Sequence, residues 1–182
     1  MKVMILPGNG NTPIDANWYP YAKEKLEELG LDVILTEMPD PELARKEYWL
    51  PFIEEKTNGE ENLILIGHSS GAIAILKYLE THKIRGAVLV GVYHTDLGEE
   101  EERQSGYFDD EWKWEAIKKN IDWIVIFAST DDPYFSIDEP RFVRDQLGAE
   151  YYEYTDQGHF GSSHKDKTEF REMIEVIKRK LQ

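Results

Sequence analysis

The sequence predicts one α/β domain in which helices cover both faces of a six-stranded parallel sheet. Short β-rich runs alternate with amphipathic helical patterns along the chain, which is typical of βαβ units with right-handed crossovers. One run, 85–92, is apolar at nearly every position, as expected of a strand buried on both faces. Because the chain shows no internal repeat or interdomain linker, residues 1–182 are expected to form a single domain.

The predicted strands are short runs of β-branched and aliphatic residues bounded by turn residues. The first ends at a loop, Pro7-Gly8-Asn9-Gly10-Asn11, and the second ends at Pro39-Asp40-Pro41. The strands are expected at 2–6, 32–38, 62–66, 85–92, 122–128 and 150–154.

Helices are predicted where apolar residues recur every three or four positions. Gly30 ends the first helix, whereas Pro51 is expected to kink or split the second. The helices are expected at 18–29, 42–55, 70–81, 111–119, 137–147 and 168–181.

Composition narrows the possible functions. The net charge of −15 argues against binding to nucleic acid or to an anionic membrane surface, because both would repel the chain. The local acidic run 99–102 is expected to be a solvated loop or the start of a helix.

No cysteine is present, which excludes disulfides and thiolate chemistry. No apolar run approaches the roughly 20 residues of a membrane span, and no signal peptide precedes the first strand, so a cytoplasmic protein is expected.

The most informative motif is Gly67-His68-Ser69-Ser70-Gly71, which joins the apolar run 62–66 to a helical pattern. In such a Gly-x-Ser-x-Gly elbow the nucleophilic serine lies on a sharp turn between strand and helix. The positions two before and two after it must be nearly free of side chain, so that strand and helix can approach closely. Ser69 is therefore the candidate nucleophile, and His68 is expected to pack or bond locally.

Two later strands end in groups that can activate a serine. Functional groups gather at the carboxyl ends of strands in open α/β sheets, so Asp132 and His159 are expected near Ser69. His159 would accept the serine proton, and Asp132 would hold the second nitrogen of the imidazole. The chain order of serine, acid and histidine is that of α/β-hydrolase triads.

Alternatives remain for both supporting roles. Asp131, directly before Asp132, and Asp96, on the loop after the fourth strand, are the other candidate acids. His164 is the alternative base, although its polar surroundings favour an exposed position.

The tetrahedral intermediate of acyl transfer needs two backbone N–H donors. The first is expected at Ser70, which follows the nucleophile at the start of a helix. The second is expected in the loop after the first strand, at Asn9 or Gly10, because its glycines let the backbone approach a substrate. His94, which follows the fourth strand, and the aromatic Phe135 are expected beside the substrate.

Motifs of cofactor and metal chemistry are missing from the sequence. The loop after the first strand has Pro13 where a dinucleotide fingerprint needs its third glycine. There is no Walker A lysine, His-Glu-x-x-His pattern or EF-hand loop. We therefore expect no cofactor and no metal.

The chain resembles the small serine hydrolases of the retinoblastoma-binding-protein-nine type, within the α/β-hydrolase superfamily. The resemblance spans nearly the whole chain in the expected order. It rests on Leu-Pro-Gly-Asn-Gly at 6–10, Met-Pro-Asp-Pro at 38–41, Trp-Leu-Pro-Phe at 49–52, Ile-Gly-His-Ser-Ser-Gly-Ala-Ile-Ala at 66–74, Asp-Leu-Gly at 96–98, Ser-Gly-Tyr-Phe at 105–108, Ser-Thr-Asp-Asp-Pro at 129–133 and Gly-His-Phe at 158–160.

This resemblance implies a compact α/β-hydrolase fold with strand order 2-1-3-4-5-6 and no large lid. It places nucleophile, acid and base on Ser69, Asp132 and His159. The family member that names the type carries a Leu-x-Cys-x-Glu motif for a retinoblastoma-type pocket protein. This chain has no cysteine and reads Glu-Glu-Lys-Thr-Asn-Gly-Glu at 54–60, so pocket-protein binding is not expected.

Together these observations predict a serine hydrolase that cleaves a small ester, thioester or amide through an acyl-enzyme. A carboxylesterase-like activity on a small-molecule substrate is expected, with amidase or peptidase activity as variants. The polar stretch 94–110 is too short for a folded lid domain, so an open site is expected. The alternatives are an acyltransferase and a non-catalytic binding or scaffold protein that keeps the hydrolase fold.

Overall fold

The computed structural model describes residues 1–161 and 166–182 and confirms the predicted sheet. Six parallel strands are ordered β2-β1-β3-β4-β5-β6. They are β1 (Lys2–Leu6), β2 (Asp32–Ile34), β3 (Leu63–His68), β4 (Ile84–Val90), β5 (Ile121–Ser129) and β6 (Glu150–Tyr154).

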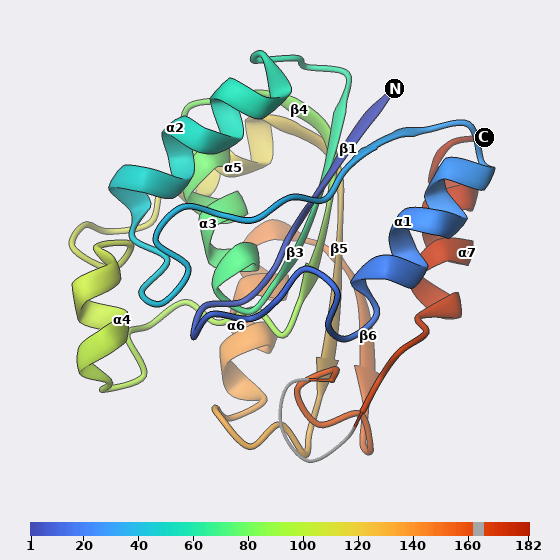
Figure 1. Cartoon of the computed structure of the whole chain (residues 1–182). Coiled ribbons are helices and arrows are strands. Elements are labelled where there is room, and N and C mark those ends of the chain that lie inside the picture. Colours follow the sequence, from blue (N-terminus) through green and yellow to red (C-terminus); the bar gives the residue numbers. More distant parts are fainter. Residues whose placement is uncertain (162–165) are drawn as a thin grey trace.

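Helices cover both faces of this sheet (Figure 1). Helices α1 and α7 lie together on one face, α2, α3, α5 and α6 lie on the other, and α4 projects beside the carboxyl ends of the strands. The helices are α1 (Tyr19–Glu28), α2 (Lys46–Thr57), α3 (Ser70–Leu79), α4 (Glu100–Ser105), α5 (Trp114–Lys119), α6 (Asp138–Leu147) and α7 (Arg171–Lys180).

Successive residues of the central strands alternate between two hydrophobic cores. In β1, Val3 and Ile5 pack with α1 and α7, whereas Met4 and Leu6 belong to the core beneath α2 and α3. All four side chains are fully buried. A strand covered on both faces needs apolar residues at consecutive positions, which explains the continuous apolar runs in the sequence.

The register brings two loops together at the point where the strand order reverses. Strand β1 pairs with β2 on one side and with β3 on the other, and Leu6 lies opposite Gly67. The loop that follows β1 therefore lies beside the turn that follows β3. In open α/β sheets this reversal point is where ligands bind.

Helix α2 differs from its prediction at both ends. Ala44 has a φ of 53°, which a helix does not permit, so the helix begins at Lys46 and not at residue 42. Asp40 stabilises this start by accepting hydrogen bonds from the backbone and the guanidinium of Arg45. Pro51 lies inside α2 but does not split it. Proline has no N–H to donate to the carbonyl of Glu47, and because Pro51 and Glu47 are both exposed, water can bind that carbonyl instead.

Other boundaries shift by a few residues. Strand β2 ends at Ile34 and not at residue 38, and α5 begins at Trp114 and not at residue 111. The acidic run 99–102 leads into α4, in agreement with the expected helix start.

The turn between β3 and α3 is as tightly packed as the glycine spacing predicted. A Cβ atom on Gly67 would lie 2.5 Å from the backbone carbonyl group of Gly71. A Cβ atom on Gly71 would lie 2.5 Å from the carbonyl oxygen of Leu6 and 2.6 Å from that of Pro7. Strand β1, strand β3 and helix α3 therefore meet with no room for a methyl group.

We expect Gly71→Ala to destabilise the fold by about 3 kcal/mol, because the methyl group would have to displace backbone atoms. Urea-induced unfolding measures this free energy. Gly98→Ala is the matched control: Gly98 has a φ of 78° but no atom near its Cβ position, so only the conformational cost of about 1 kcal/mol is expected. Equal losses in the two variants would show that the close approach carries no special cost.

Candidate active site

Ser69 occupies the tip of the turn between β3 and α3. Its φ of 54° and ψ of −122° lie outside the regions that side-chain-bearing residues ordinarily adopt. Hydrogen bonds hold this backbone in place: the Ser69 N–H donates to the carbonyl of Val90 at 2.9 Å, and the Ser69 carbonyl accepts from the N–H of Ala72 at 2.8 Å. The strained conformation is thus fixed by neighbours on β4 and α3.

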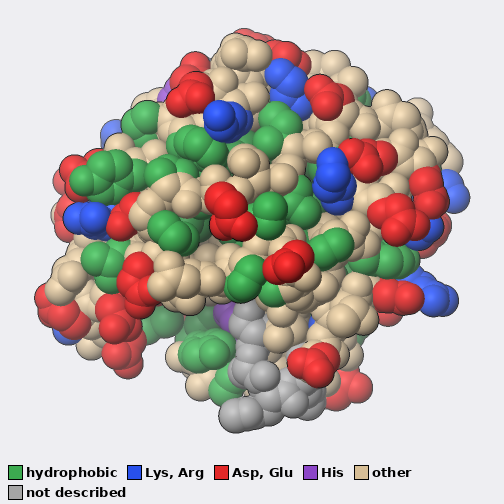
Figure 2. Space-filling model, viewed as in Figure 1, with side chains coloured by type: hydrophobic (Ala, Val, Ile, Leu, Met, Phe, Trp, Pro, Cys, Tyr) green, Lys and Arg blue, Asp and Glu red, His purple; other side chains and the backbone are tan. Residues whose placement is uncertain are grey.

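A pocket of about 540 Å³ opens at this turn. The surface is hollowed beside the lobe that contains α4, and acidic side chains lie on that lobe (Figure 2). Three glutamates but neither lysine nor arginine occur among the described residues that line the pocket. They are Gly8, Asn9, Gly10, Thr12, Ser69, Tyr93, Leu97, Glu99, Glu101, Glu102, Pro133, Tyr134, Phe135 and His159.

Asp132 and His159 form a buried pair next to this pocket. The His159 Nδ1 atom lies 2.6 Å from Asp132 Oδ2, and each side chain is only 3% exposed. The other oxygen of Asp132 accepts the backbone N–H of Tyr134 at 3.0 Å. Because a carboxylate only accepts, Nδ1 carries the ring proton and Nε2 is left as the basic nitrogen.

The two alternative acids, Asp131 and Asp96, have other hydrogen-bond partners. Asp131 Oδ1 accepts hydrogen bonds from the Ser129 hydroxyl at 2.5 Å and from the Gly158 N–H at 2.8 Å, so it ties the loop after β5 to the loop after β6. Asp96 accepts the Gly98 N–H at 3.0 Å within its own loop. The alternative base, His164, lies outside the described residues.

His68 has a more specific position than the sequence suggested. Its Nδ1 atom lies 2.6 Å from the Tyr19 hydroxyl, and its Nε2 atom lies 2.8 Å from the carbonyl oxygen of His159, 91 residues away. A carbonyl only accepts, so Nε2 carries the proton and Nδ1 accepts from Tyr19. His68 thereby anchors the backbone of His159 to the turn that carries Ser69, a role for which a single sequence gives no signal.

Burial fixes the protonation states of His68 and Tyr19. It lowers the pKa of His68 to about 3, with a further contribution from the neighbouring His159, and it raises the pKa of Tyr19 to about 12. Both groups are therefore neutral over the physiological pH range.

Gly91 is a second residue that the sequence did not single out. It follows β4 with a φ of 60°, and a Cβ atom there would lie 2.8 Å from Cε1 of His159. The imidazole thus packs directly against the backbone of Gly91, where no other residue type would fit.

The two expected oxyanion donors of the β1 loop differ in availability. The Gly10 N–H already donates to the carbonyl of Glu42 at 3.0 Å. The carbonyl of Asn9 accepts from the Thr12 hydroxyl at 2.7 Å, which fixes the peptide plane that follows Asn9. The loop also approaches Ser69 closely, since a Cβ atom on Gly8 would lie 3.3 Å from Cβ of Ser69.

The two residues expected beside the substrate are separated. Phe135 lines the Ser69 pocket, and its ring centroid lies 5.6 Å from that of His159. His94 borders a different hollow, where its ring stacks on Phe142 at 4.0 Å and its Nδ1 atom lies 2.8 Å from Glu139. The chain therefore places Phe135 beside Ser69 and turns His94 toward α6.

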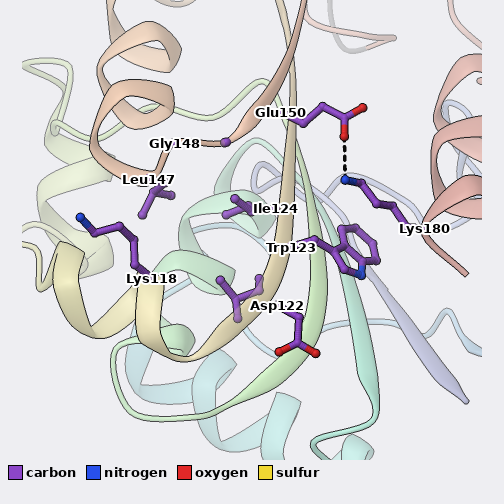
Figure 3. A pocket seen from close by; sticks show the side chains of 10 residues that line it. Lys118, Asp122, Trp123, Ile124, Leu147, Gly148, Glu150 and Lys180 are labelled. Carbon is purple, nitrogen blue, oxygen red and sulfur yellow. Dashed lines mark ion pairs between the residues drawn. The ribbon is translucent and has the colours of Figure 1, made fainter.

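Another hollow, also about 540 Å³, lies at the amino ends of β5 and β6 (Figure 3). Lys180 and Glu150 form an ion pair of 2.7 Å at its edge, and Lys118 and Asp122 are further charged residues of its wall. The residues described there include neither serine nor histidine, so this hollow lacks the residue types expected of a serine nucleophile and its base.

The described residues contain no group of three or more His, Cys, Asp or Glu side chains placed to hold a metal ion. None of their helices combines the length and the apolar character that crossing a membrane requires.

Comparison with known proteins identifies the family. A family model described as serine hydrolase matches residues 3–178. The chain belongs to the serine hydrolase family. This hydrolase is 45% identical over 182 residues to Serine hydrolase RBBP9 of Rattus norvegicus, covering 99% of this chain and 95% of that protein. It is 30% identical over 152 residues to YdeN of Bacillus subtilis, covering 79% of this chain and 78% of YdeN.

Solved structures confirm the fold of the hydrolase. The crystal structure of the ydeN gene product from B. subtilis superposes with a TM-score of 0.87 at 24% identity, covering 99% of this chain and 98% of that chain. Est1E from Butyrivibrio proteoclasticus superposes with a TM-score of 0.75 at 11% identity, covering 99% and 86% of the two chains. The expected compact α/β-hydrolase fold is therefore confirmed.

The buried His68 gives the hydrolase a defined pH dependence of stability. Its pKa is about 3 in the fold and near its ordinary value of 6.5 in the unfolded chain. Between these values the unfolded state binds more protons, so stability falls as the pH is lowered from about 6.5, by up to about 1.4 kcal/mol per pH unit.

We expect His68→Gln, whose amide keeps one donor and one acceptor, to be less stable than the wild type at pH 7. The difference in unfolding free energy should shrink as the pH falls toward 4.5, because the variant has no imidazole to protonate. Urea-induced unfolding at a series of pH values measures both curves. Parallel curves would contradict the assignment of a neutral, buried His68.

Proposed function

We propose that the hydrolase cleaves a small ester, thioester or amide through an acyl-enzyme on Ser69. The observation that carries this proposal is the buried Asp132–His159 pair, 2.6 Å apart, at a pocket that also contains Ser69 on a strained turn. A hydroxyl is a weak nucleophile until a neighbouring base takes its proton. A neutral imidazole whose Nδ1 proton is held by a carboxylate is such a base.

The proposed reaction proceeds in two halves. Ser69 Oγ attacks the substrate carbonyl while His159 Nε2 takes the serine proton, and Asp132 stabilises the imidazolium that forms. His159 then gives this proton to the leaving alcohol, thiol or amine. A water molecule, deprotonated by His159, attacks the acyl-enzyme and releases the acid, which regenerates Ser69.

The developing oxyanion would be bound by two backbone N–H groups, those of Ser70 and Asn9. Ser70 is the first residue of α3, so its N–H points out of the helix N-terminus, where the helix dipole favours negative charge. Asn9 is preferred over Gly10 because the Gly10 N–H is already bound to Glu42.

We expect Ser69→Ala to abolish labelling by a fluorophosphonate probe and to lower the hydrolysis of p-nitrophenyl esters by at least about 10³-fold. The probe reacts covalently with an activated serine, so the alanine variant lacks the reacting atom. Ser136→Ala alters an exposed serine outside the pocket and serves as the matched control, with wild-type labelling expected. A wild-type protein that is never labelled and cleaves no ester or amide would favour a non-catalytic binding role.

The two neighbouring aspartates are expected to differ in their effects. Asp132→Asn should lower kcat by about 10²- to 10⁴-fold, because the amide no longer stabilises the imidazolium and favours the wrong tautomer. Asp131→Asn keeps an acceptor oxygen for Ser129 and Gly158, so a change of less than about 10-fold in kcat is expected. Steady-state kinetics of both variants test the choice, and the reverse pattern would make Asp131 the catalytic acid.

A further inference from the structure

Glu102 on α4 connects the loop after β1 with the start of α3, the two segments that carry the proposed oxyanion donors. Its Oε1 atom accepts a hydrogen bond from the Asn9 side chain at 3.4 Å, and its Oε2 atom accepts one from the Tyr93 hydroxyl at 2.8 Å. The Tyr93 hydroxyl lies 3.3 Å from the Ser70 hydroxyl. One carboxylate thus touches Asn9 directly and reaches Ser70 through a single tyrosine.

The direction of this chain follows from its chemistry. Burial raises the pKa of Tyr93 well above its ordinary value, so Tyr93 keeps its single hydroxyl proton. That proton goes to Glu102, because a carboxylate is the stronger acceptor. Ser70 must therefore donate to the Tyr93 oxygen, which fixes the rotamer of Ser70 at the start of α3.

The surroundings of Glu102 make these hydrogen bonds important. It lines the pocket, and its partner Tyr93 is only 2% exposed. Within the part of the chain that the structure describes, no Lys or Arg forms an ion pair with Glu102. Burial raises the pKa of this carboxyl, and a carboxylate without a cation is stable in such a place only when hydrogen bonds satisfy its oxygens.

We propose that Glu102 is the positioning residue of the oxyanion hole. It holds the loop after β1 and the start of α3 at one separation, so that the N–H groups of Asn9 and Ser70 converge on the same point. The inference rests on the proposed function. Each of its oxygens accepts a hydrogen bond from Asn9 or Tyr93, so the role assigned to Glu102 acts through these residues.

The position of α4 explains how Glu102 reaches the pocket. Helix α4 belongs to the segment between β4 and α5 and projects beside the carboxyl ends of the strands (Figure 1), and its Glu101 and Glu102 line the pocket. The segment contributes three glutamates to the pocket lining, and Glu102 is the one that binds Asn9 and Tyr93. Glu100 is the one residue of the acidic run 99–102 that does not line the pocket. It is exposed and accepts hydrogen bonds from Arg103 and Gln104 of its own helix.

The test compares Glu102→Ala with Glu100→Gln, a matched control on the same helix outside the pocket. Removal of one oxyanion donor costs about 10²- to 10³-fold in kcat, and a displaced donor should cost somewhat less. We expect Glu102→Ala to lower kcat about 10- to 100-fold on a p-nitrophenyl ester, with KM changed less than about 3-fold. Glu100→Gln should retain the wild-type kcat.

A second readout separates positioning from a merely structural role. A trifluoromethyl ketone forms a tetrahedral adduct with the nucleophilic serine and places an oxyanion in the hole, so its affinity reports the donors. Its inhibition constant should rise in Glu102→Ala by the same factor by which kcat/KM falls. If Glu102→Ala does not fold, Glu102→Gln replaces it: its amide offers one acceptor for two donors, so a smaller loss in the same direction is expected.

A double-mutant cycle with Asn9→Ala completes the test. This variant keeps the backbone N–H of residue 9 and removes only the side chain that binds Glu102. If both side chains act through the same contact, the double variant should be no more than about 3-fold slower than the slower single variant.

Three outcomes would overturn the inference: a wild-type kcat in Glu102→Ala or Glu102→Gln, a loss confined to KM, or fully additive losses in the cycle. Each would do so while Ser69→Ala remained inactive. Full activity in Ser69→Ala would instead overturn the proposed function itself, so the two failures are distinguishable.

Discussion

The close approach of helix α3 to strands β1 and β3 is the constraint on which the rest of the site depends. The backbones meet at Gly67 and Gly71 with no space for a side chain, and the turn between them has to reverse direction within three residues. This geometry forces the positive φ of Ser69 and lifts its side chain out of the sheet. It also brings the loop after β1 against Ser69, so a single packing contact positions both Ser69 and its surroundings.

Much of this arrangement could be predicted from sequence because it depends on local rules. The six strands and the tight turn follow from short-range patterns, together with the tendency of parallel sheets to collect functional groups at one edge, whereas the strand order came from the resemblance to a known family. The pairing of Asp132 with His159 follows from the same rule, since each lies in the loop that follows a strand. The start of α2 was missed because it depends on Ala44, whose positive φ is set by the neighbouring Asp40–Arg45 interaction and not by periodicity.

The remaining parts of the site depend on contacts between distant segments, for which a single sequence carries no signal. His68 binds the backbone of His159 across 91 residues, and Gly91 is needed only because an imidazole from another loop packs on it. His94 has the same position after a strand as other site residues, but Glu139 and Phe142 hold it in a different hollow. Position in the chain therefore predicted which loops meet, whereas side-chain partners decided which residues of those loops face the pocket.

The glutamates at the mouth of the pocket have a consequence for turnover. Cleavage of a neutral ester or amide creates a carboxylate that was absent from the substrate. Under the proposed function this new charge arises beside Glu99 and Glu101, on a chain with a net charge of −15. Repulsion between like charges lowers the affinity for the acid product and leaves that for a neutral substrate unchanged, so the electrostatic field of the pocket favours release of the product. Because such repulsion is screened over about 8 Å at physiological ionic strength, product inhibition should grow as salt is added.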